Sequence, residues 1–426
     1  MNPTKLHPSL ASALSTKAAA EAPLHVIVRF LAGPVARGEA VALAAIEPDA
    51  SFRLLHARAL TVSAETVAAL SMDPGVDLIW PDLPVHAWLD TRAPLVRAPR
   101  VWDLGFTGRG VRIGIVDTGI DAGHPDFGDR LRAYRDFVTS EPAAQGEPRD
   151  PNGHGTHVAG VAAGSGSASD GRYRGIAPEA ELVVARVLDG AGNGRTSHVM
   201  AGIEWAMEQG ARVINVSLGG PPYPSDGSDA FSVLCDAAVD AGAVVCVAAG
   251  NLGPTGHTIG APAAAAKVIT VGASRSLGDD GREGVAPFSS RGPTGDGRAK
   301  PDLLFPGEAI TAARATGTSL GTVRAALYTS LSGTSQATPM AAGSAALLLQ
   351  ATPGLQPDEI KSRLRRGARR LPDAAAVAQG AGRGDAYNTF VAAEGRPAGD
   401  TPPAEEPPRT ERAGCLAAPV AALRRR

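Results

Sequence analysis

Cysteine, aromatic side chains and long apolar runs are all scarce in this chain of 426 residues. The 3 cysteines, Cys235, Cys246 and Cys415, are too few and too scattered for a disulfide framework or a cysteine-bound metal cluster. No stretch approaches the run of about 18 apolar residues that a membrane-spanning helix requires. We therefore expect no disulfide framework, no cysteine-ligated metal and no membrane partner.

The chain also has no excess of charge of either sign. Its net charge is -2, which gives no basic field to attract nucleic acid or an acidic membrane surface. Residues 1–25 lack the basic start and the apolar run of a secretory signal. We therefore expect a cytoplasmic monomer that does not bind nucleic acid, with export by another route left open.

What the chain does have, from residue 89 onward, is an alternation of apolar strands and helices. Continuous apolar strands that alternate with helices indicate a parallel sheet covered on both faces, and ligands bind at the carboxyl ends of such strands. We predict an α/β fold with a doubly wound, mostly parallel sheet. The predicted strands are 111–117, 182–188, 213–218, 243–249 and 267–272, and the predicted helices are 155–164, 196–209, 229–241, 335–350 and 357–368.

The residues before this region predict a smaller α+β domain over 23–88, which follows a flexible lead over 1–22. Its expected strands and helices rest on alternating apolar residues and on a capping box at its second helix. The strands are expected at 24–31, 51–61 and 76–80, and the helices at 34–46 and 63–72. The large domain then spans 89–393, and a disordered tail rich in proline and charge is expected over 394–426.

Three short stretches contain the residue types that nucleophilic catalysis needs. Ser335 lies in a small-residue loop at the start of a strong apolar helix, Asp117 ends an apolar strand, and His154 begins a helical run of small residues. A serine hydroxyl becomes a nucleophile when a base takes its proton, and the base needs a partner that fixes its tautomer. Taken alone, Thr334 or Ser335 would more simply cap the helix, so the two distant stretches are what favours catalysis.

In these stretches the chain resembles the subtilisin-like serine proteases, the subtilase family. The matching segments come in the order Asp, His, Ser and are 117–121 with 124–126, 154–160 and 333–339. The resemblance covers residues 89–393 and, more weakly, 23–88. It implies a serine endopeptidase that hydrolyses polypeptides through an acyl-enzyme.

The resemblance also assigns roles within the triad. Ser335 would be the nucleophile, His154 the base that takes its proton, and Asp117 the group that orients the base. His157 is a rival base three residues on. The family motif gives the role to the first histidine, so we interpret His157 as a packed or capping histidine.

The groups that bind substrate follow from the same resemblance. Asn251 would donate to the oxyanion together with the Ser335 backbone N–H, although a simple turn residue is the alternative. Gly260 would form the floor of the specificity pocket and leave room for a large apolar side chain before the scissile bond. An edge that pairs with an extended substrate backbone would consist of Ser217, Leu218 and Gly219.

The small domain resembles the inhibitory prodomain of subtilases, a ferredoxin-like β-α-β-β-α-β module. In the family the tail of this module lies in the active-site cleft as a first substrate. Trp88 is a large apolar residue at the end of the domain, so we expect autoprocessing after Trp88 by the molecule's own Ser335. An unrelated small domain is the alternative.

Departures from the family pattern limit what can be carried over. Gln336 stands where the family usually has methionine and Met340 where it usually has histidine, and we expect neither to touch the triad. Asp126 matches a calcium ligand by position, but loop 164–174 departs from the family's calcium-binding segment. One carboxylate does not make a cage of roughly six or more oxygens. We therefore expect no cofactor, no metal at the catalytic site and no tight calcium at Asp126, with calcium elsewhere left open.

Other classes of function remain open on the sequence alone. A metallohydrolase would use the Asp and His residues of 117–126 and 154–157, although no glutamate-bearing zinc motif surrounds them and Ser335 would have no role. A non-catalytic binding protein on the same fold would be indicated by a missing triad residue, and none is missing. A nucleotide binder would use the glycines of 190–194 or 108–110. The first segment lacks the full dinucleotide-binding fingerprint and the second precedes a strand instead of following one, so we interpret both as turn glycines.

Overall fold

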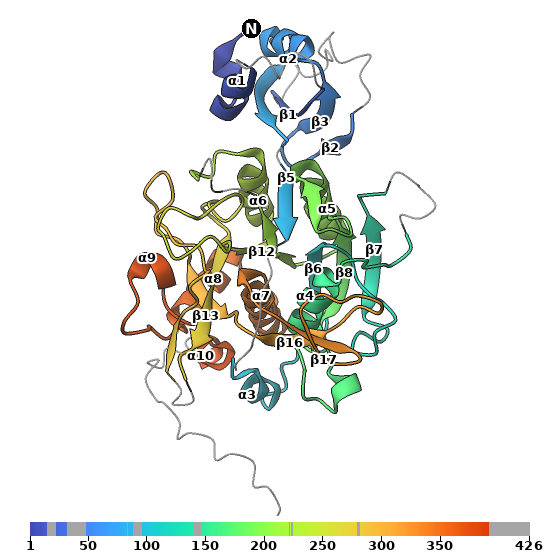
Figure 1. Ribbon diagram of the computed structural model, residues 1–426, viewed down its shortest axis with the longest axis vertical. Coiled ribbons are helices and arrows are strands. Elements are labelled where there is room, and N and C mark those ends of the chain that lie inside the picture. Colours follow the sequence, from blue (N-terminus) through green and yellow to red (C-terminus); the bar gives the residue numbers. More distant parts are fainter. Residues whose placement is uncertain are drawn as a thin grey trace, which may run out of the picture.

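The computed structural model describes residues 1–14, 23–31, 48–82, 84–87, 96–139, 146–220, 222, 225–278 and 282–391. Within these residues a small N-terminal domain sits on a large domain, and the strand β5 (Pro84–Ala87) runs from the first into the second (Figure 1). No helix in these ranges is both long enough and apolar enough to cross a membrane. The helix predicted at 34–46 and the tail predicted at 394–426 lie outside the described residues.

The large domain is built on an 8-stranded sheet with the order β14-β13-β12-β10-β6-β8-β7, and β15 pairs with β13. Every pairing in it is parallel except that of β13 with β14. The strands are β6 (Arg112–Asp117), β7 (Leu131–Asp136), β8 (Glu181–Arg186), β10 (Val213–Val216), β12 (Val244–Ala248), β13 (Ile269–Ser276), β14 (Glu283–Val285) and β15 (Leu303–Pro306). The predicted doubly wound, mostly parallel sheet is confirmed.

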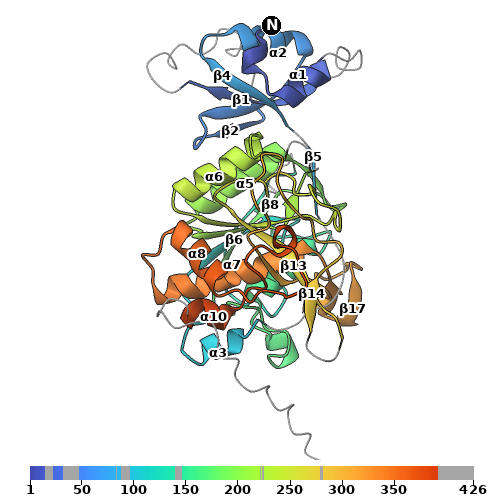
Figure 2. The same ribbon diagram turned by 90° about the vertical axis from the view of Figure 1, so that its left-hand side faces the viewer.

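Helices cover both faces of this sheet (Figure 2). Neighbouring residues of one strand point to opposite faces, so Val213 packs in one apolar core and Ile214 in the other, and both are fully buried. This double burial is why the strands have continuous apolar sequences. On the Ile214 side lie α5 (Thr196–Glu208) and α6 (Ala230–Asp240), and on the Val213 side lie α4 (His154–Ala163), α7 (Thr334–Ala351) and α8 (Pro357–Arg366).

A three-stranded antiparallel sheet precedes α7 and is absent from the sequence-based prediction. Its order is β16-β18-β17, with β16 (Ile310–Ala313), β17 (Thr322–Ala325) and β18 (Tyr328–Leu331). All four residues of β17 are exposed, so this strand has no apolar pattern to reveal it. Because β18 ends at Leu331, the sheet leads the chain directly to Ser335.

The small domain holds a four-stranded antiparallel sheet with the order β2-β3-β1-β4 and the helix α2 (Ala64–Met72). The single strand predicted at 51–61 is wrong, because this segment belongs to two strands joined by the turn 53–56. His56 takes a positive φ of 50° in that turn, and the turn contains none of the Gly, Pro, Asn or Asp residues that usually mark one. The strands are β1 (Leu24–Phe30), β2 (Ala50–Phe52), β3 (Ala57–Val62) and β4 (Val76–Pro81).

The first residues of the chain are part of this domain, in contrast to the flexible lead expected there. Pro3–Lys5 forms a short 3-10 helix and α1 spans Pro8–Leu14. Leu6 and Leu10 are buried in the small domain's own core, and the His7 amide donates to the Ile79 carbonyl at 2.9 Å. Residues 1–14 therefore add apolar cover to the small sheet.

The second face of the small sheet packs on α5 and α6 of the large domain. Ile27, Phe52 and Trp80 share one buried core with residues of those two helices. The indole N–H of Trp80 donates to the Ser228 carbonyl at 3.0 Å. Asp82 accepts the amide of Ser197 at 2.8 Å, which satisfies a free donor at the start of α5. The two domains are thus joined by an apolar face with hydrogen bonds around it.

Glu204 on α5 binds the backbone of the turn that joins β2 to β3. Its two carboxylate oxygens accept the amides of Arg53, at 3.2 Å, and Leu54, at 2.8 Å. Burial at this interface raises the pKa of Glu204. An acidic side chain of the large domain therefore recognises the backbone of the small one.

Candidate active site

Asp117 and His154 meet at the carboxyl edge of the central sheet. Asp117 is the last residue of β6 and His154 is the first residue of α4. Nδ1 of His154 lies 2.7 Å from Oδ1 of Asp117, and both side chains are fully buried. The same carboxylate oxygen accepts the Thr118 amide at 2.8 Å. The imidazole is thus held through Nδ1, which leaves Nε2 as the nitrogen for proton transfer.

Asp150 joins the two segments that carry this pair, and sequence reasoning missed it. One of its oxygens accepts the Thr118 hydroxyl and the Gly153 amide, both at 2.8 Å. The other accepts the amide and the hydroxyl of Thr156, at 2.8 and 2.6 Å. An Asp just before a predicted helix is a capping signal that points to such a role. Asp150 fixes the start of α4 against the end of β6.

Close backbone contacts explain a glycine of the histidine segment. A Cβ added to Gly155 would lie 2.2 Å from the Gly119 carbonyl oxygen, far inside contact distance. Gly119 itself has a φ of +123°, and a Cβ there would meet the Arg149 carbonyl at 1.9 Å. Neither position can accept a side chain without moving the segments that hold Asp117 and His154.

Ser335 is the second residue of α7 and its side chain is fully buried. Its hydroxyl donates to the Ser217 carbonyl at 2.8 Å, and the Ser217 hydroxyl donates to the Ser335 carbonyl at 2.9 Å. The helix begins after Gly333 without any side-chain cap, so the capping role considered for Thr334 and Ser335 is wrong. Ser217 therefore binds Ser335 with both its backbone carbonyl and its side-chain hydroxyl.

Gln336 contacts the histidine of the predicted triad, so the expectation that it does not is wrong. Its side-chain nitrogen lies 3.5 Å from Nε2 of His154, and the whole side chain is buried. Helical geometry alone does not show this contact, because His154 belongs to a segment far away in the chain. Met340, the other departure from the family, packs in the apolar core beside α4.

His157 is a packed histidine, as interpreted from the sequence. Its Nε2 lies 2.9 Å from the Ile310 carbonyl oxygen and its side chain has no exposure. Burial lowers the pKa of His157 to about 3, so the ring is neutral at ordinary pH. With Nε2 donating to a carbonyl, His157 ties α4 to β16.

Asn251 lies three residues beyond β12, beside the start of α7. Its Oδ1 accepts both the amide of Thr334, at 3.0 Å, and the hydroxyl of the same residue, at 2.9 Å. The carboxamide is therefore fixed through its oxygen, and Nδ2 is the end that can donate to another group. This is more than a turn residue needs, and it ties Asn251 to the residue before Ser335.

The predicted substrate edge is already paired with a strand. Leu218 and Gly219 form β11, which pairs antiparallel with β5 of the small domain. On its other side β5 pairs with β9 (Asn193–Arg195). An extended segment thus lies between two strands of the large domain, directly before Trp88, which itself lies outside the described residues (Figure 1).

Gly260 is buried next to this edge. The Gly220 amide donates to the Ala261 carbonyl at 2.9 Å, which joins the end of the 217–219 segment to the Gly260 loop. The Ala264 amide in turn donates to the Gly260 carbonyl at 2.9 Å. The residues predicted for backbone pairing and for the pocket floor are therefore brought together.

The acidic and histidine side chains near the triad are not assembled as a metal site. His124 Nε2 is 2.8 Å from the Leu327 carbonyl, and Asp121 accepts the Thr316 amide at 2.8 Å. Among the residues that the structure describes, no group of three or more His, Cys, Asp or Glu side chains is placed to hold a metal ion. The arrangement does not support the metallohydrolase alternative.

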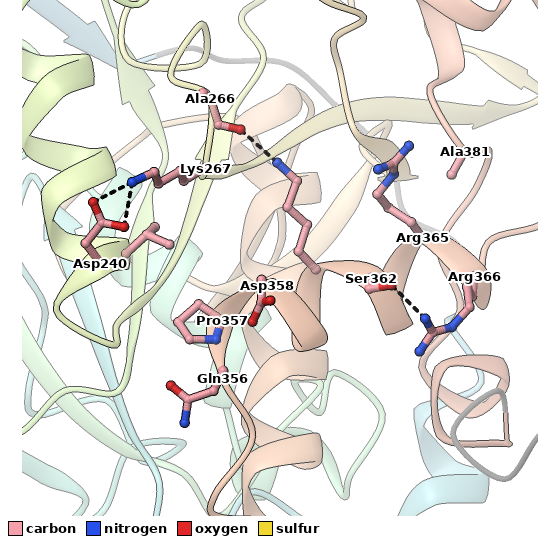
Figure 3. Close-up of a pocket in the computed structure, with 12 residues that line it drawn as sticks. Asp240, Ala266, Lys267, Gln356, Pro357, Asp358, Ser362, Arg365, Arg366 and Ala381 are labelled. Atoms are coloured by element: carbon pink, nitrogen blue, oxygen red, sulfur yellow. Dashed lines mark hydrogen bonds and ion pairs between the residues drawn. The ribbon is translucent and has the colours of Figure 1, made fainter.

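A large cavity of about 890 Å³ lies elsewhere, between the C-terminal end of α6 and helix α8 (Figure 3). Three of its cationic side chains have partners: Lys267 pairs with Asp240 at 2.5 Å, and Lys361 donates to the Ala266 carbonyl at 3.2 Å. Arg366 donates to the Ser362 hydroxyl at 2.7 Å. None of the triad residues lines this cavity, so it is not the candidate site.

Comparisons with known proteins agree with this geometry. Residues 108–384 match the Peptidase_S8 profile, which describes the subtilase family. The chain is 41% identical over 325 residues to the serine protease AprX of Bacillus subtilis (strain 168), covering 72% of each chain. It is 36% identical over 318 residues to subtilisin E of the same organism, covering 74% of this chain and 75% of that one.

A solved structure shows the same fold. Fervidolysin from Fervidobacterium pennivorans, described as a keratinolytic enzyme related to subtilisin, superposes with a TM-score of 0.71 at 22% identity. The superposition covers 87% of this chain, which spans 61% of the fervidolysin chain. At this identity the likeness concerns the fold.

Proposed function

The chain belongs to the subtilase family and is a subtilisin-like serine protease, and from that premise we propose that Asp117, His154 and Ser335 are its catalytic triad. The observation that carries the proposal is the buried 2.7 Å bond between His154 and Asp117, together with the position of Ser335 in the first turn of α7. Peptide substrates would be cut internally, through an acyl-enzyme on Ser335.

Each group would have one task in the first half of the reaction. Asp117 keeps the proton of His154 on Nδ1, so Nε2 carries the lone pair that takes the proton of the Ser335 hydroxyl. That hydroxyl donates to the Ser217 carbonyl in the described arrangement, so it must turn toward Nε2 before it attacks. As Oγ bonds to the substrate carbonyl carbon, the carbonyl oxygen becomes an oxyanion.

The oxyanion would lie between two donors, Nδ2 of Asn251 and the backbone N–H of Ser335 at the start of α7. Helix N-termini favour negative charge, and a donor already held in place loses little on reaction. The bonds from Thr334 to Oδ1 of Asn251 supply that restraint. The imidazolium then gives its proton to the leaving amine, and water hydrolyses the acyl-enzyme by the same steps.

Substrates would bind as an added strand between β11 and β9, the place that β5 takes. Backbone pairing supplies affinity, and the pocket next to Gly260 selects large apolar side chains. We further propose that the small domain is an inhibitory prodomain, because its exit strand occupies this place. Trp88 would enter the pocket, and Ser335 would cut between Trp88 and Leu89.

Purified wild type and Ser335→Ala, compared side by side, test the proposal. The wild type should hydrolyse casein and show a new amino terminus at Leu89, and Ser335→Ala should do neither. Trp88→Asp should slow the cut, because a carboxylate would enter an apolar pocket without a partner. Casein hydrolysis by Ser335→Ala at the wild-type rate would exclude the triad, whereas activity from an uncut chain would exclude only the processing site.

A further inference from the structure

Asp126 and loop 164–175 occupy the part of the fold where the family resemblance leads one to look for calcium. Asp126 follows β6, and the loop follows α4. A calcium ion needs roughly six to eight oxygen ligands whose lone pairs face the ion. The question is therefore where the lone pairs of Asp126 and of the neighbouring carbonyl groups point.

The carboxylate of Asp126 faces donors. It is 1% exposed, and the Tyr328 hydroxyl lies 2.9 Å from each of its oxygens. Oδ1 also accepts the Ala168 amide at 3.0 Å and lies 3.4 Å from the Ser167 hydroxyl. The hydroxyl and amide protons take the positions around the carboxylate that a metal ion would need.

The carbonyl groups nearby face a resident cation, the guanidinium of Arg130. Arg130 donates to the carbonyls of Ala163, at 2.6 Å, and Ala180, at 2.9 Å, and also to the carbonyl of Asp126 itself. Ala163 is the last residue of α4. An arginine side chain stays protonated in proteins, so this positive charge is permanent.

The loop is further closed by its own contacts. The Gly175 amide donates to the Gly164 carbonyl at 2.8 Å, and the Ser165 amide donates to the Asp126 carbonyl at 3.0 Å. The ring of Tyr173 lies 4.7 Å from that of Tyr328, centroid to centroid. Each end of the loop is therefore tied without a metal ion.

We propose that Asp126, Arg130, Tyr328 and loop 164–175, here called the Asp126 lock, replace a structural metal ion at this place. Tyr328 begins β18, which leads to Ser335, and Ala163 ends the helix that begins with His154. The lock thus joins the far end of the histidine helix to the strand before the nucleophile. The side chains at this place do not fit a calcium ion, and the protein is held there by its own donors.

Thermal unfolding in the Ser335→Ala background tests the Asp126 lock without interference from autolysis. Excess EDTA and excess calcium chloride should leave Tm within about 1 °C of each other, because a ligand shifts Tm only if it binds the folded state. Tyr328→Phe and Arg130→Gln should each lower Tm by roughly 5 °C, because they leave buried acceptors without a donor. Calcium should not restore either loss.

Matched controls use the same chemical changes elsewhere. Tyr134→Phe removes a hydroxyl whose bond to the Arg149 carbonyl is long, at 3.3 Å, and Arg109→Gln removes a largely exposed guanidinium. Both should leave Tm within about 1 °C of the parent. Equal Tm values for Tyr328→Phe and Tyr134→Phe would overturn the lock.

Direct binding gives a measurement that does not depend on the variants' stability. Calorimetric titration of the folded parent with calcium chloride should show no heat that Asp126→Asn removes. Calcium binding, or a calcium-dependent rise in Tm, that disappears in Asp126→Asn would overturn the proposal. Both experiments use an inactive protein, so their outcome is independent of the proposed triad.

Discussion

The large domain covers both faces of its sheet with its own helices, whereas the small domain covers only one. In β1 the side chains of Val26 and Val28 pack in the small domain's own core, and Ile27 between them packs against the large domain. A domain of this size has little apolar surface to bury alone. The small domain is therefore complete only when docked, and the large domain has an independent core.

The proposed catalytic residues and the strand that pairs with the substrate edge are also divided between the two domains. The proposed triad comes entirely from the large domain, and the small domain contributes the strand β5 that pairs with β11 and β9. Changes to the triad should then leave docking intact, and changes to the docking face should leave the core of the large domain intact. The following predictions test that separation.

Asp117→Asn should have the largest effect. The amide can no longer hold the proton of His154 on Nδ1, so the ring loses the tautomer that makes Nε2 basic, and kcat should fall roughly 10⁴-fold. Tm should change by no more than about 2 °C, and the small domain should remain docked. Steady-state hydrolysis of a chromogenic peptide measures kcat, and a loss below about tenfold would contradict the assigned role.

Asn251→Ala should have the second largest effect on activity, with kcat lower by roughly 10²–10³-fold and KM little changed. The oxyanion exists only along the reaction path, so its donor affects turnover more than substrate binding. Separate determination of kcat and KM on the same peptide makes the distinction. A rise in KM at unchanged kcat would assign Asn251 to ground-state binding instead.

Trp80→Ala should destabilise the small domain and leave the stability of the large domain unchanged. The change removes the largest side chain of the docking face and its bond to Ser228, and cavities of this kind cost about 3–5 kcal/mol. In full-length Ser335→Ala protein, hydrogen exchange should become at least roughly a hundredfold faster in β1 and β3. Exchange in β10 and β12 should not change.

Trp102→Ala is the matched control, because its indole bonds the Ile176 carbonyl within the large domain at 2.9 Å. In Trp102→Ala the backbone amides of the large domain should exchange faster. If both variants accelerated exchange equally in both domains, the two domains would form a single cooperative unit and the comparison would be wrong.

His157→Gln should have the smallest effect, on the pH dependence of the large domain's stability. The folded-state pKa is about 3 and the ordinary value is 6.5, so between these values only the unfolded chain takes up the proton. The free energy of unfolding should therefore fall as pH drops below 6.5, by about 2 kcal/mol at pH 5 from this group. Glutamine can donate to Ile310 but cannot titrate. Urea unfolding at pH 7 and pH 5 gives the drop in the free energy of unfolding between the two pH values. This drop should be smaller by that amount in His157→Gln than in the parent, and equal drops in the two proteins would contradict the assignment.

Much of the fold could be predicted because the information is local. The buried strands have continuous apolar sequences, and the segments around Asp117, His154 and Ser335 stand at strand or helix ends. The turn at His56 was missed because no typical turn residue marks it. The strand β17 was missed because all its residues are exposed.

The parts that could not be predicted depend on contacts between distant segments. The contact of Gln336 with His154 and the bond of Tyr328 to Asp126 join residues about half the chain apart. No periodicity records such a contact. Asp150 lies between these cases, because its position before a predicted helix is a capping signal that the sequence analysis did not use, whereas its bond to Thr118 joins distant segments.

The strand β5 is joined by the chain itself to the strands β11 and β9 between which it lies, and this covalent link would affect how proteolysis is controlled. A tethered segment meets its site at an effective concentration on the order of millimolar, whatever the concentration of the protein. Before any cut, even a weakly binding strand would therefore keep competing peptides out. After a cut the same strand becomes a separate molecule, and its occupancy depends on how much of it is present. Dilution would then be enough to begin proteolysis, and enzyme at high concentration would stay inhibited longer than enzyme at low concentration.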